Sequence, residues 1–131
     1  SNIELLGIDA LELIDLHKKR QDERSLIYLD PPYYNKGSQL YRNFYTPSDH
    51  KKISDSIKSI KTPWLVTYDN CESIRSLYSD QRSEEFSLVY STSFDRPKTT
   101  EFMVYGNMNI VRKPELSKSI RPYPKIWDAA A

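Results

Sequence analysis

The residues of this chain best suited to chemistry are Asp30-Pro31-Pro32-Tyr33. They follow the apolar run Leu26-Ile27-Tyr28-Leu29, which has the length and composition of a short buried strand. In open α/β sheets, ligands bind beyond the carboxyl ends of the strands, where this motif stands. Because proline fixes φ and has no N–H, the two prolines predict a stiff turn with outward-facing carbonyls. A carboxylate, a free carbonyl and an aromatic ring on one stiff turn are suited to gripping a planar ring that carries an amino group.

The exocyclic amine of a ring such as adenine is a weak nucleophile, because its lone pair is delocalised into the ring. If the Asp30 carboxylate and the Pro31 carbonyl each accept one N–H bond from it, they favour a pyramidal nitrogen with an available lone pair. Such acceptors act through placement and charge in a dry pocket, without a full proton transfer beforehand. Tyr33 supplies a ring on which a flipped base can stack. The motif therefore predicts chemistry on the amino group of a nucleobase.

Hydrophobic periodicity predicts the elements that must position this turn. Strands are expected over residues 3–6, 26–29, 64–68, 86–91 and 100–106, and helices over residues 10–19, 47–60 and 71–78. The stripe of the middle helix that we expect to be buried consists of Ile53, Ile57 and Ile60. Its start is marked by Thr46 before Pro47, with Ser48 and Asp49 as alternative caps. An ordinary strand-ending turn is the alternative interpretation of the motif, and this ordered set of elements argues against it.

The motif and its surroundings resemble the amino-methylating DNA methyltransferases, in particular the Dam-like (D12 class) adenine-N6 enzymes. Asp-Pro-Pro-Tyr after an apolar strand is similar to their catalytic motif. The other segments that look like parts of these enzymes are residues 2–10 (strand and acidic turn), 40–60 (loop and helix), 63–70 (next strand) and 86–105 (closing hairpin). The resemblance spans roughly residues 2–107, and the order of the elements makes it more specific than the motif alone.

The resemblance implies an α/β fold, namely the C-terminal half of a Rossmann-like methyltransferase sheet that ends in an antiparallel hairpin. This domain is expected to cover residues 1–109, and the proline- and charge-rich residues 110–131 are expected to form an extended tail. The implied reaction is direct methyl transfer from S-adenosylmethionine to N6 of a flipped adenine in double-stranded DNA. Asp at position 30, instead of Ser or Asn, favours adenine by resemblance. Methylation of cytosine N4, of RNA or of a protein amide stays open.

The resemblance also assigns roles to single residues. The catalytic residues are those of the motif: Asp30, Pro31, Pro32 and Tyr33. The residues expected to contact the cofactor are Ile8, Asp9, Ala10 and Asp30. Asp9 is equally suited to be the N-cap of the helix that begins at Ala10, with Glu12 as its capping partner, and one residue can do both. No metal site is expected.

Residues 34–45 form an aromatic segment with interspersed cations, which suits a loop that lies over a flipped base and the strand beside it. Basic residues at the tip of the closing hairpin are suited to phosphates. The expected DNA contacts are Lys36, Arg42, Tyr45, Arg96 and Lys98. Two alternatives stay open: the aromatic residues pack the loop onto the sheet, which we favour for Phe44, and the basic residues are only solvated.

The glycine-rich turn through which the family binds S-adenosylmethionine is not found. This chain has three well-separated glycines, Gly7, Gly37 and Gly106, and the target-recognition insert is absent as well. We therefore expect the C-terminal half of a methyltransferase, inactive alone and with weak or absent binding of S-adenosylmethionine. A non-catalytic remnant or partner subunit that keeps the half-fold is the alternative.

Composition limits the partners and the cellular compartment that we expect for this chain. A formal net charge of +1 gives no global attraction to nucleic acid, so DNA contacts must come from local patches. The single cysteine, Cys71, excludes an internal disulfide and is expected to be a packing residue in a reducing cytoplasm. His17 and His50 stand alone in charged helices, so we expect them to be solvated and not metal ligands. Neither an apolar run of membrane-spanning length nor a signal peptide is visible.

The sheet order implied by the resemblance, 3-2-1-4-5-7-6, has a consequence for the catalytic strand. Two strands separate the segment at 3–6 from the segment at 26–29 in that order, and neither is found in this chain. The catalytic strand then presents an unpaired apolar edge, which proteins rarely leave open. Either the strand at 3–6 moves beside it, or two chains join as a symmetric dimer. We expect the dimer, because the helix at 10–19 restricts the first strand.

Overall fold

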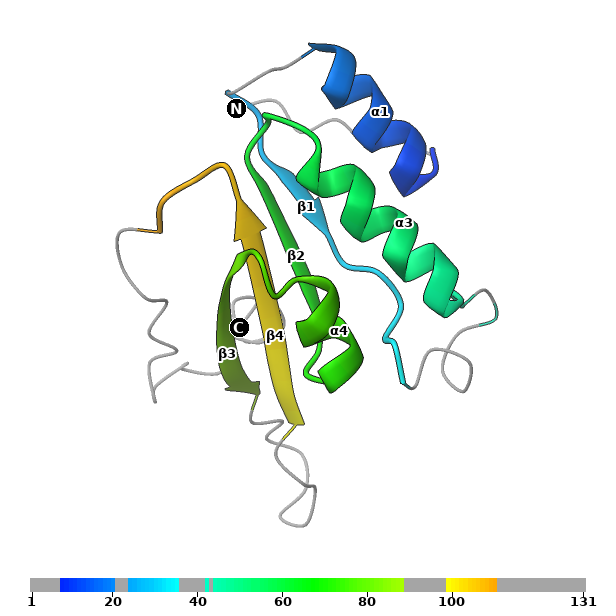
Figure 1. Cartoon of the computed structure of the whole chain (residues 1–131), viewed down its shortest axis with the longest axis vertical. Coiled ribbons are helices and arrows are strands. Elements are labelled where there is room, and N and C mark those ends of the chain that lie inside the picture. Colours follow the sequence, from blue (N-terminus) through cyan, green and yellow to red (C-terminus); the bar gives the residue numbers. More distant parts are fainter. Residues whose placement is uncertain (1–7, 21–23, 36–41, 43, 89–98, 111–131) are drawn as a thin grey trace, which may run out of the picture.

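The computed structural model describes residues 8–20, 24–35, 42, 44–88 and 99–110. Its elements are α1 (Ala10–Arg20), β1 (Ile27–Leu29), α3 (Pro47–Lys58), β2 (Trp64–Asp69), α4 (Glu72–Leu77), β3 (Arg82–Leu88) and β4 (Thr99–Gly106) (Figure 1). The predicted α/β class and three helices are confirmed. The strand predicted at 3–6 lies outside the described residues. In the described part, no helix has the length and apolar character needed to cross a membrane.

The four strands form one mixed sheet in the order β1-β2-β4-β3. β1 runs parallel to β2, whereas β4 runs antiparallel to both β2 and β3. This order is that of the last four strands in the predicted sheet. The predicted start of β3 at Phe86 is wrong, because the ladder with β4 already begins with the pair Arg82 and Tyr105.

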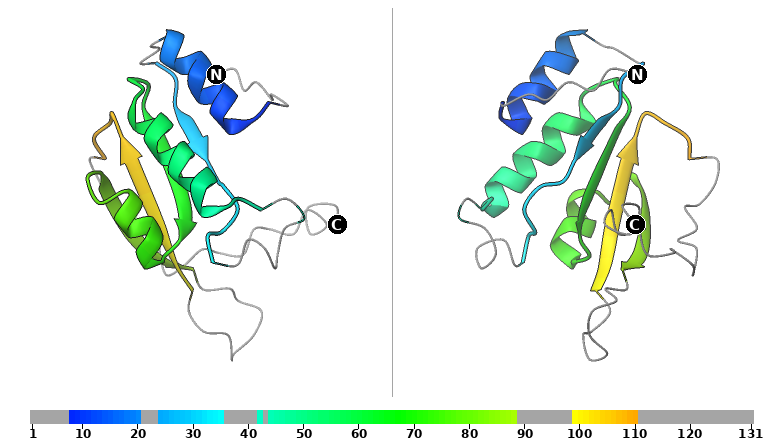
Figure 2. Two further views of the ribbon diagram at one scale, coloured as in Figure 1. Left: turned by 45° about the vertical axis from the view of Figure 1, so that its right-hand side comes forward. Right: turned by 180° about the vertical axis from the view of Figure 1, so that it is seen from behind.

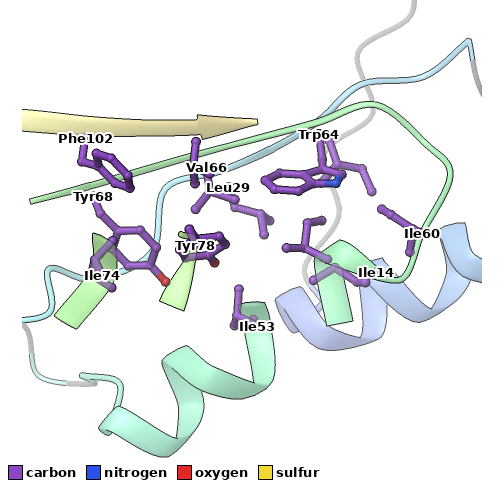
Figure 3. Packing of buried hydrophobic residues seen from close by; sticks show 13 residues of the cluster. Ile14, Leu29, Ile53, Ile60, Trp64, Val66, Tyr68, Ile74, Tyr78 and Phe102 are labelled. Carbon is purple, nitrogen blue, oxygen red and sulfur yellow. The ribbon is translucent and has the colours of Figure 1, made fainter. Parts of the chain in front are cut away.

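All three helices pack on one face of the sheet, and the described residues place no helix on the other (Figures 1 and 2). Side chains alternate along a strand, so each strand contributes every second residue to the helix-covered face. In β2, Trp64, Val66 and Tyr68 are buried, while the residues between them are half-buried. The core joins these strand residues to residues of the helices, among them Ile14, Ile53 and Ile74 (Figure 3).

The start of α3 is fixed by a capping box. The Thr46 hydroxyl accepts a bond from the Asp49 amide at 3.2 Å, and the Asp49 carboxylate accepts one from the Thr46 amide at 2.8 Å. Pro47 takes the first helical turn, where its missing N–H costs nothing. The predicted cap at Thr46 is confirmed, as is the buried stripe of Ile53, Ile57 and Ile60.

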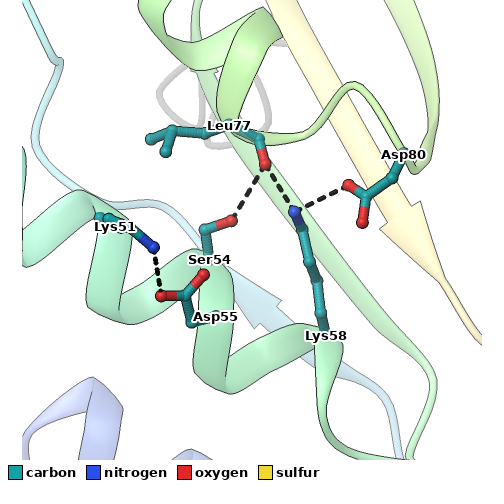
Figure 4. Close-up of polar contacts among 6 residues, drawn as sticks. All are labelled: Lys51, Ser54, Asp55, Lys58, Leu77 and Asp80. Carbon is teal, nitrogen blue, oxygen red and sulfur yellow. Dashed lines mark hydrogen bonds and ion pairs between the residues drawn. The ribbon is translucent and has the colours of Figure 1, made fainter.

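The end of α4 is held against α3 by polar contacts (Figure 4). The Lys58 ammonium and the Ser54 hydroxyl both donate to the Leu77 carbonyl, one of the last carbonyls of α4. Lys58 also forms an ion pair with Asp80 at 2.7 Å. Because a positive charge near a helix C-terminus is favourable, this lysine stabilises α4 and joins the two helices. Cys71 precedes α4 and packs against the core, as predicted.

Gly106, at the end of β4, is required by close packing. A Cβ built on it would lie 2.4 Å from the Trp64 ring, far inside van der Waals contact. Trp64 pairs with Gly106 in the β2–β4 ladder, so the indole occupies the space that a side chain would need. This glycine therefore packs against the core residue Trp64, at the end of β2 opposite to the Asp-Pro-Pro-Tyr motif.

Candidate active site

The motif begins where β1 ends. Leu29 is buried, and the next residue, Asp30, is exposed. The Thr67 hydroxyl of β2 donates to one Asp30 carboxylate oxygen at 3.3 Å. Tyr28 Oη lies 3.1 Å from the same Thr67 oxygen. Since a hydroxyl has one proton, Tyr28 must donate to Thr67 when Thr67 donates to Asp30. This chain of bonds engages one oxygen of Asp30 and leaves the other directed to no partner in the described part.

Asp69, the last residue of β2, holds the loop that follows the motif. One oxygen of its carboxylate accepts from the Tyr34 amide at 2.8 Å, and the other accepts from the Asn35 amide at 3.2 Å. A charged acceptor makes such bonds stronger than those between neutral groups. Asp69 of the neighbouring strand β2 therefore fixes the chain just after the two prolines, and this holds the turn at Asp30 in place.

Glu101 of β4 holds the side chain of Tyr33. The Tyr33 hydroxyl donates to Glu101 Oε1 at 2.6 Å. Glu101 is only 6% exposed and faces Asp69 across the β2–β4 ladder. Burial raises the pKa of the Glu101 carboxyl, with smaller increases from Asp69 and Asp30, while the bond from Tyr33 lowers it. Three carboxylates, those of Asp30, Asp69 and Glu101, thus lie in the motif or hold it. The sequence assigned a role only to that of Asp30.

The predicted solvent exposure of His50 is wrong. The residue is 1% exposed, and its ring lies between those of Tyr34, Tyr45 and Tyr68, with centroids 5.1, 5.4 and 5.4 Å away. His50 Nδ1 and Tyr68 Oη share a hydrogen bond of 3.1 Å. Burial lowers the pKa of His50. The reason is its place in the helix: position 50 is three residues before Ile53 and continues the buried stripe.

His17 differs from the prediction as well, because it is half-buried. Neither histidine belongs to a group of His, Cys, Asp or Glu side chains that could hold a metal ion, within the ranges that the structure describes.

A family model described as "D12 class N6 adenine-specific DNA methyltransferase" matches residues 8–93. The chain belongs to this family. The match contains the motif and Asp69 but ends before β4, so Glu101 lies outside it. A comparison with curated proteins gives no match. Membership identifies the chain as a DNA adenine methyltransferase by family.

In the structure, Asp9 caps the start of α1, which is one of the two roles that the sequence allowed. Its carboxylate accepts from the Leu11 amide at 2.9 Å, and its carbonyl accepts from the Leu13 amide at 3.0 Å. The negative charge of Asp9 also helps to raise the pKa of Tyr45, for which burial is the larger cause. Asp9 is therefore close enough to Tyr45, which packs on His50, to act on its hydroxyl through charge. Ile8 is exposed and Ala10 is half-buried.

Two of the predicted DNA contacts, Arg42 and Tyr45, lie among the described residues. Arg42 is exposed, whereas Tyr45 is half-buried against His50. The expectation that Phe44 packs the loop onto the sheet is wrong, because half of its surface is exposed. Tyr45 packs in its place. The predicted contacts Lys36, Arg96 and Lys98 lie outside the described residues.

Proposed function

We propose that this chain carries the catalytic turn of an S-adenosylmethionine-dependent methyltransferase that modifies N6 of an adenine flipped out of double-stranded DNA. The placement of Asp30 supports this most directly. It is exposed beyond β1, with one oxygen bound by Thr67 and the following loop bound by Asp69. An acid that is oriented before the substrate arrives needs no reorganisation during the reaction, which is the condition for electrostatic preorganisation.

In this proposal, the second oxygen of Asp30 and the carbonyl of Pro31 each accept one hydrogen bond from N6. Two acceptors on one side of the amine turn its lone pair toward the opposite side. Tyr33 stacks on the base and holds it in place. S-adenosylmethionine, when bound, supplies the electrophilic methyl group. N6 gives up one proton during the transfer, and the Asp30 carboxylate that already accepts its hydrogen bond takes it.

One part of the proposed cofactor site lies among the described residues. Ile8 and Asp9 are exposed and Ala10 is half-buried at the start of α1, and we assign them with Asp30 to cofactor contacts. The methionine end needs a close backbone approach, and the described glycine, Gly106, has its space filled by Trp64. We propose that the chain alone binds S-adenosylmethionine weakly or not at all. A non-catalytic partner subunit is favoured instead if binding and turnover are both absent in a protein that also carries a glycine-rich turn.

The sheet order supports the assignment to the C-terminal half of a Rossmann-like methyltransferase sheet, because β1-β2-β4-β3 follows the implied order. The catalytic domain in this proposal covers residues 1–109, and residues 110–131 form a tail. Its DNA contacts are Lys36, Arg42, Tyr45, Arg96 and Lys98, of which Arg42 is exposed in the structure.

We also propose that two chains pair through β1. In the described part, β1 forms a ladder with β2 alone, and its flanking and central residues Leu26 and Tyr28 are 58% and 56% exposed. An open edge pairs readily with a second copy. Light scattering over a concentration series tests this. A strictly monomeric chain whose Ile27–Leu29 amides exchange freely would rule out the dimer.

The methylated atom tests the proposed function. A protein that carries this chain together with a glycine-rich turn is incubated with S-adenosylmethionine and duplex DNA, and the nucleosides are analysed by mass spectrometry. We expect N6-methyladenine. Methyl groups on cytosine N4 or on RNA alone would refute the assignment to adenine, and a matched duplex without adenine is the control substrate.

A further inference from the structure

The Tyr33 side chain is held at both ends. Its hydroxyl donates to Glu101 at 2.6 Å, a length typical of a bond to a charged oxygen. Its backbone lies directly before the Tyr34 amide, which Asp69 holds at 2.8 Å. Fixing both ends sets the line along which the ring lies and leaves only rotation of the ring about that line.

The two acids that hold Tyr33 form a pair across the ladder. Asp69 of β2 and Glu101 of β4 are directly opposite each other. By strand alternation, both lie on the sheet face without helices, since their neighbours Tyr68 and Phe102 belong to the core. Burying a carboxylate is costly unless hydrogen bonds compensate for the lost water. The bond from Tyr33 provides such compensation for Glu101.

We infer that Glu101 is a positioning residue, which fixes the place of the Tyr33 ring for stacking on the flipped base. The inference rests on the proposed function, in which Tyr33 receives that base. Stacking requires the ring to lie against the base, and a ring held in place beforehand loses less entropy when the base binds. Glu101 therefore acts on capture of the base, while Asp30 acts on its amine.

Substitutions at both ends of the bond test this in an active protein that carries the chain. Glu101→Leu leaves the Tyr33 hydroxyl without its acceptor, and Tyr33→Phe removes the donor. We expect each to raise the KM for duplex DNA about ten- to hundredfold, as for loss of a bond to a charged group, with kcat nearly unchanged. Glu101→Gln keeps an acceptor oxygen and should restore part of the loss. Combined Tyr33→Phe and Glu101→Leu should be no worse than the poorer single variant, because both remove one interaction.

The control variant is Glu85→Gln, which changes an exposed acid of β3 and should leave KM unchanged. Fluorescence of 2-aminopurine at the target position reports base flipping directly, and it should fall in Glu101→Leu. A loss confined to kcat or to thermal stability, with KM and fluorescence as in the unmodified protein, would overturn the positioning role.

A second measurement separates this inference from the proposed function. In the chain labelled on its tyrosine rings, nuclear magnetic resonance should show the Tyr33 signals shifted by Glu101→Leu and not by Glu85→Gln. Unshifted Tyr33 signals would overturn the inference whatever the activity. If the unmodified protein methylates no adenine, the proposed function fails, and the Tyr33 signals still decide whether Glu101 fixes the ring.

Discussion

Tyr33 and Tyr34 are adjacent in the chain, yet their side chains enter different environments. Tyr34 turns toward the helix-covered face, where its ring packs 5.1 Å from that of buried His50. Tyr33 turns toward the face without helices, where its hydroxyl bonds to Glu101. Asp69 accepts a hydrogen bond from the Tyr34 amide, so it holds the backbone at the point where the two side chains diverge.

The contrast shows that the two faces of the sheet hold the loop in different ways. On the helix-covered face, the loop is anchored by ring contacts that exclude water. On the other face, it is anchored by carboxylates and hydroxyls, among them Asp30, Thr67 and Glu101. Packing contributes mainly to stability, whereas fixed charges contribute mainly to orientation and catalysis. Substitutions on the two faces should therefore change different measured quantities.

Asp30→Ala should give the largest effect, on the chemical step. It removes one of the two acceptors that orient N6, and we expect activity to fall on the order of a hundredfold or more. The chain should unfold at nearly the same temperature, because Asp30 is exposed. Asp55→Ala, which changes an exposed acid of α3, is the matched control. Near-normal turnover of Asp30→Ala on adenine-containing duplex would contradict the mechanism.

Alanine substitutions at Tyr33 and Tyr34 should change different quantities, because the two side chains lie on different faces of the sheet. Tyr33→Ala should weaken capture of the flipped base by about 1–3 kcal/mol, the range for loss of a stacking aromatic ring. Tyr34→Ala should instead lower the free energy of unfolding by about 1–3 kcal/mol, less than for a fully buried ring because Tyr34 is half-buried. DNA titration and urea unfolding measure the two quantities. Equal losses of stability in both variants would contradict the separation.

Thr67→Val tests a single hydrogen bond on the sheet face without helices, which we call the polar face. Valine keeps the shape of threonine but cannot donate to Asp30, so the carboxylate loses one constraint. We expect kcat to fall about three- to tenfold, corresponding to one hydrogen bond of roughly 1 kcal/mol. Thr67→Ser keeps the hydroxyl and is the control. If both variants lose the same activity, the hydroxyl is not what orients Asp30.

Local sequence signals predicted most of the helix-covered face. The cap at Thr46 and the stripe of Ile53, Ile57 and Ile60 depend on neighbours within a few residues, and both are confirmed. The burial of His50 was missed because its polarity outweighed its spacing from Ile53. Extending the helical period by one turn toward the N-terminus would have found it.

Sequence patterns could not predict the residues that hold the loop on the polar face. Asp69 and Glu101 meet because of the register between β2 and β4, and register depends on pairing between distant segments. The early start of β3 at Arg82 has the same origin, since its first residues are polar and become a strand by pairing with β4. Asp30 was found from the sequence because the motif and its strand are contiguous.

The last effect that we predict is a pH dependence of stability from His50. Burial lowers its pKa in the folded chain, whereas an unfolded histidine titrates near about 6.5. Below that pH, the unfolded chain binds a proton that folded His50 does not, so stability is full above about pH 6.5 and falls as the pH decreases toward the folded pKa. The slope from one group cannot exceed about 1.4 kcal/mol per pH unit.

Glu101 should act with the opposite sign at more acidic pH. Its pKa is raised in the folded chain, mainly by burial, so folded Glu101 binds its proton first as the pH falls and adds stability there. Urea unfolding of the unmodified chain and of His50→Phe between pH 7.5 and 5, values chosen to bracket about pH 6.5, isolates the histidine. We expect the phenylalanine variant to lose the decrease in stability on acidification, because it keeps a ring against Tyr34 and Tyr45 without a proton to bind. The same series on His17→Phe assigns the slope to one histidine: a decrease that disappears there, and persists in His50→Phe, would contradict the prediction.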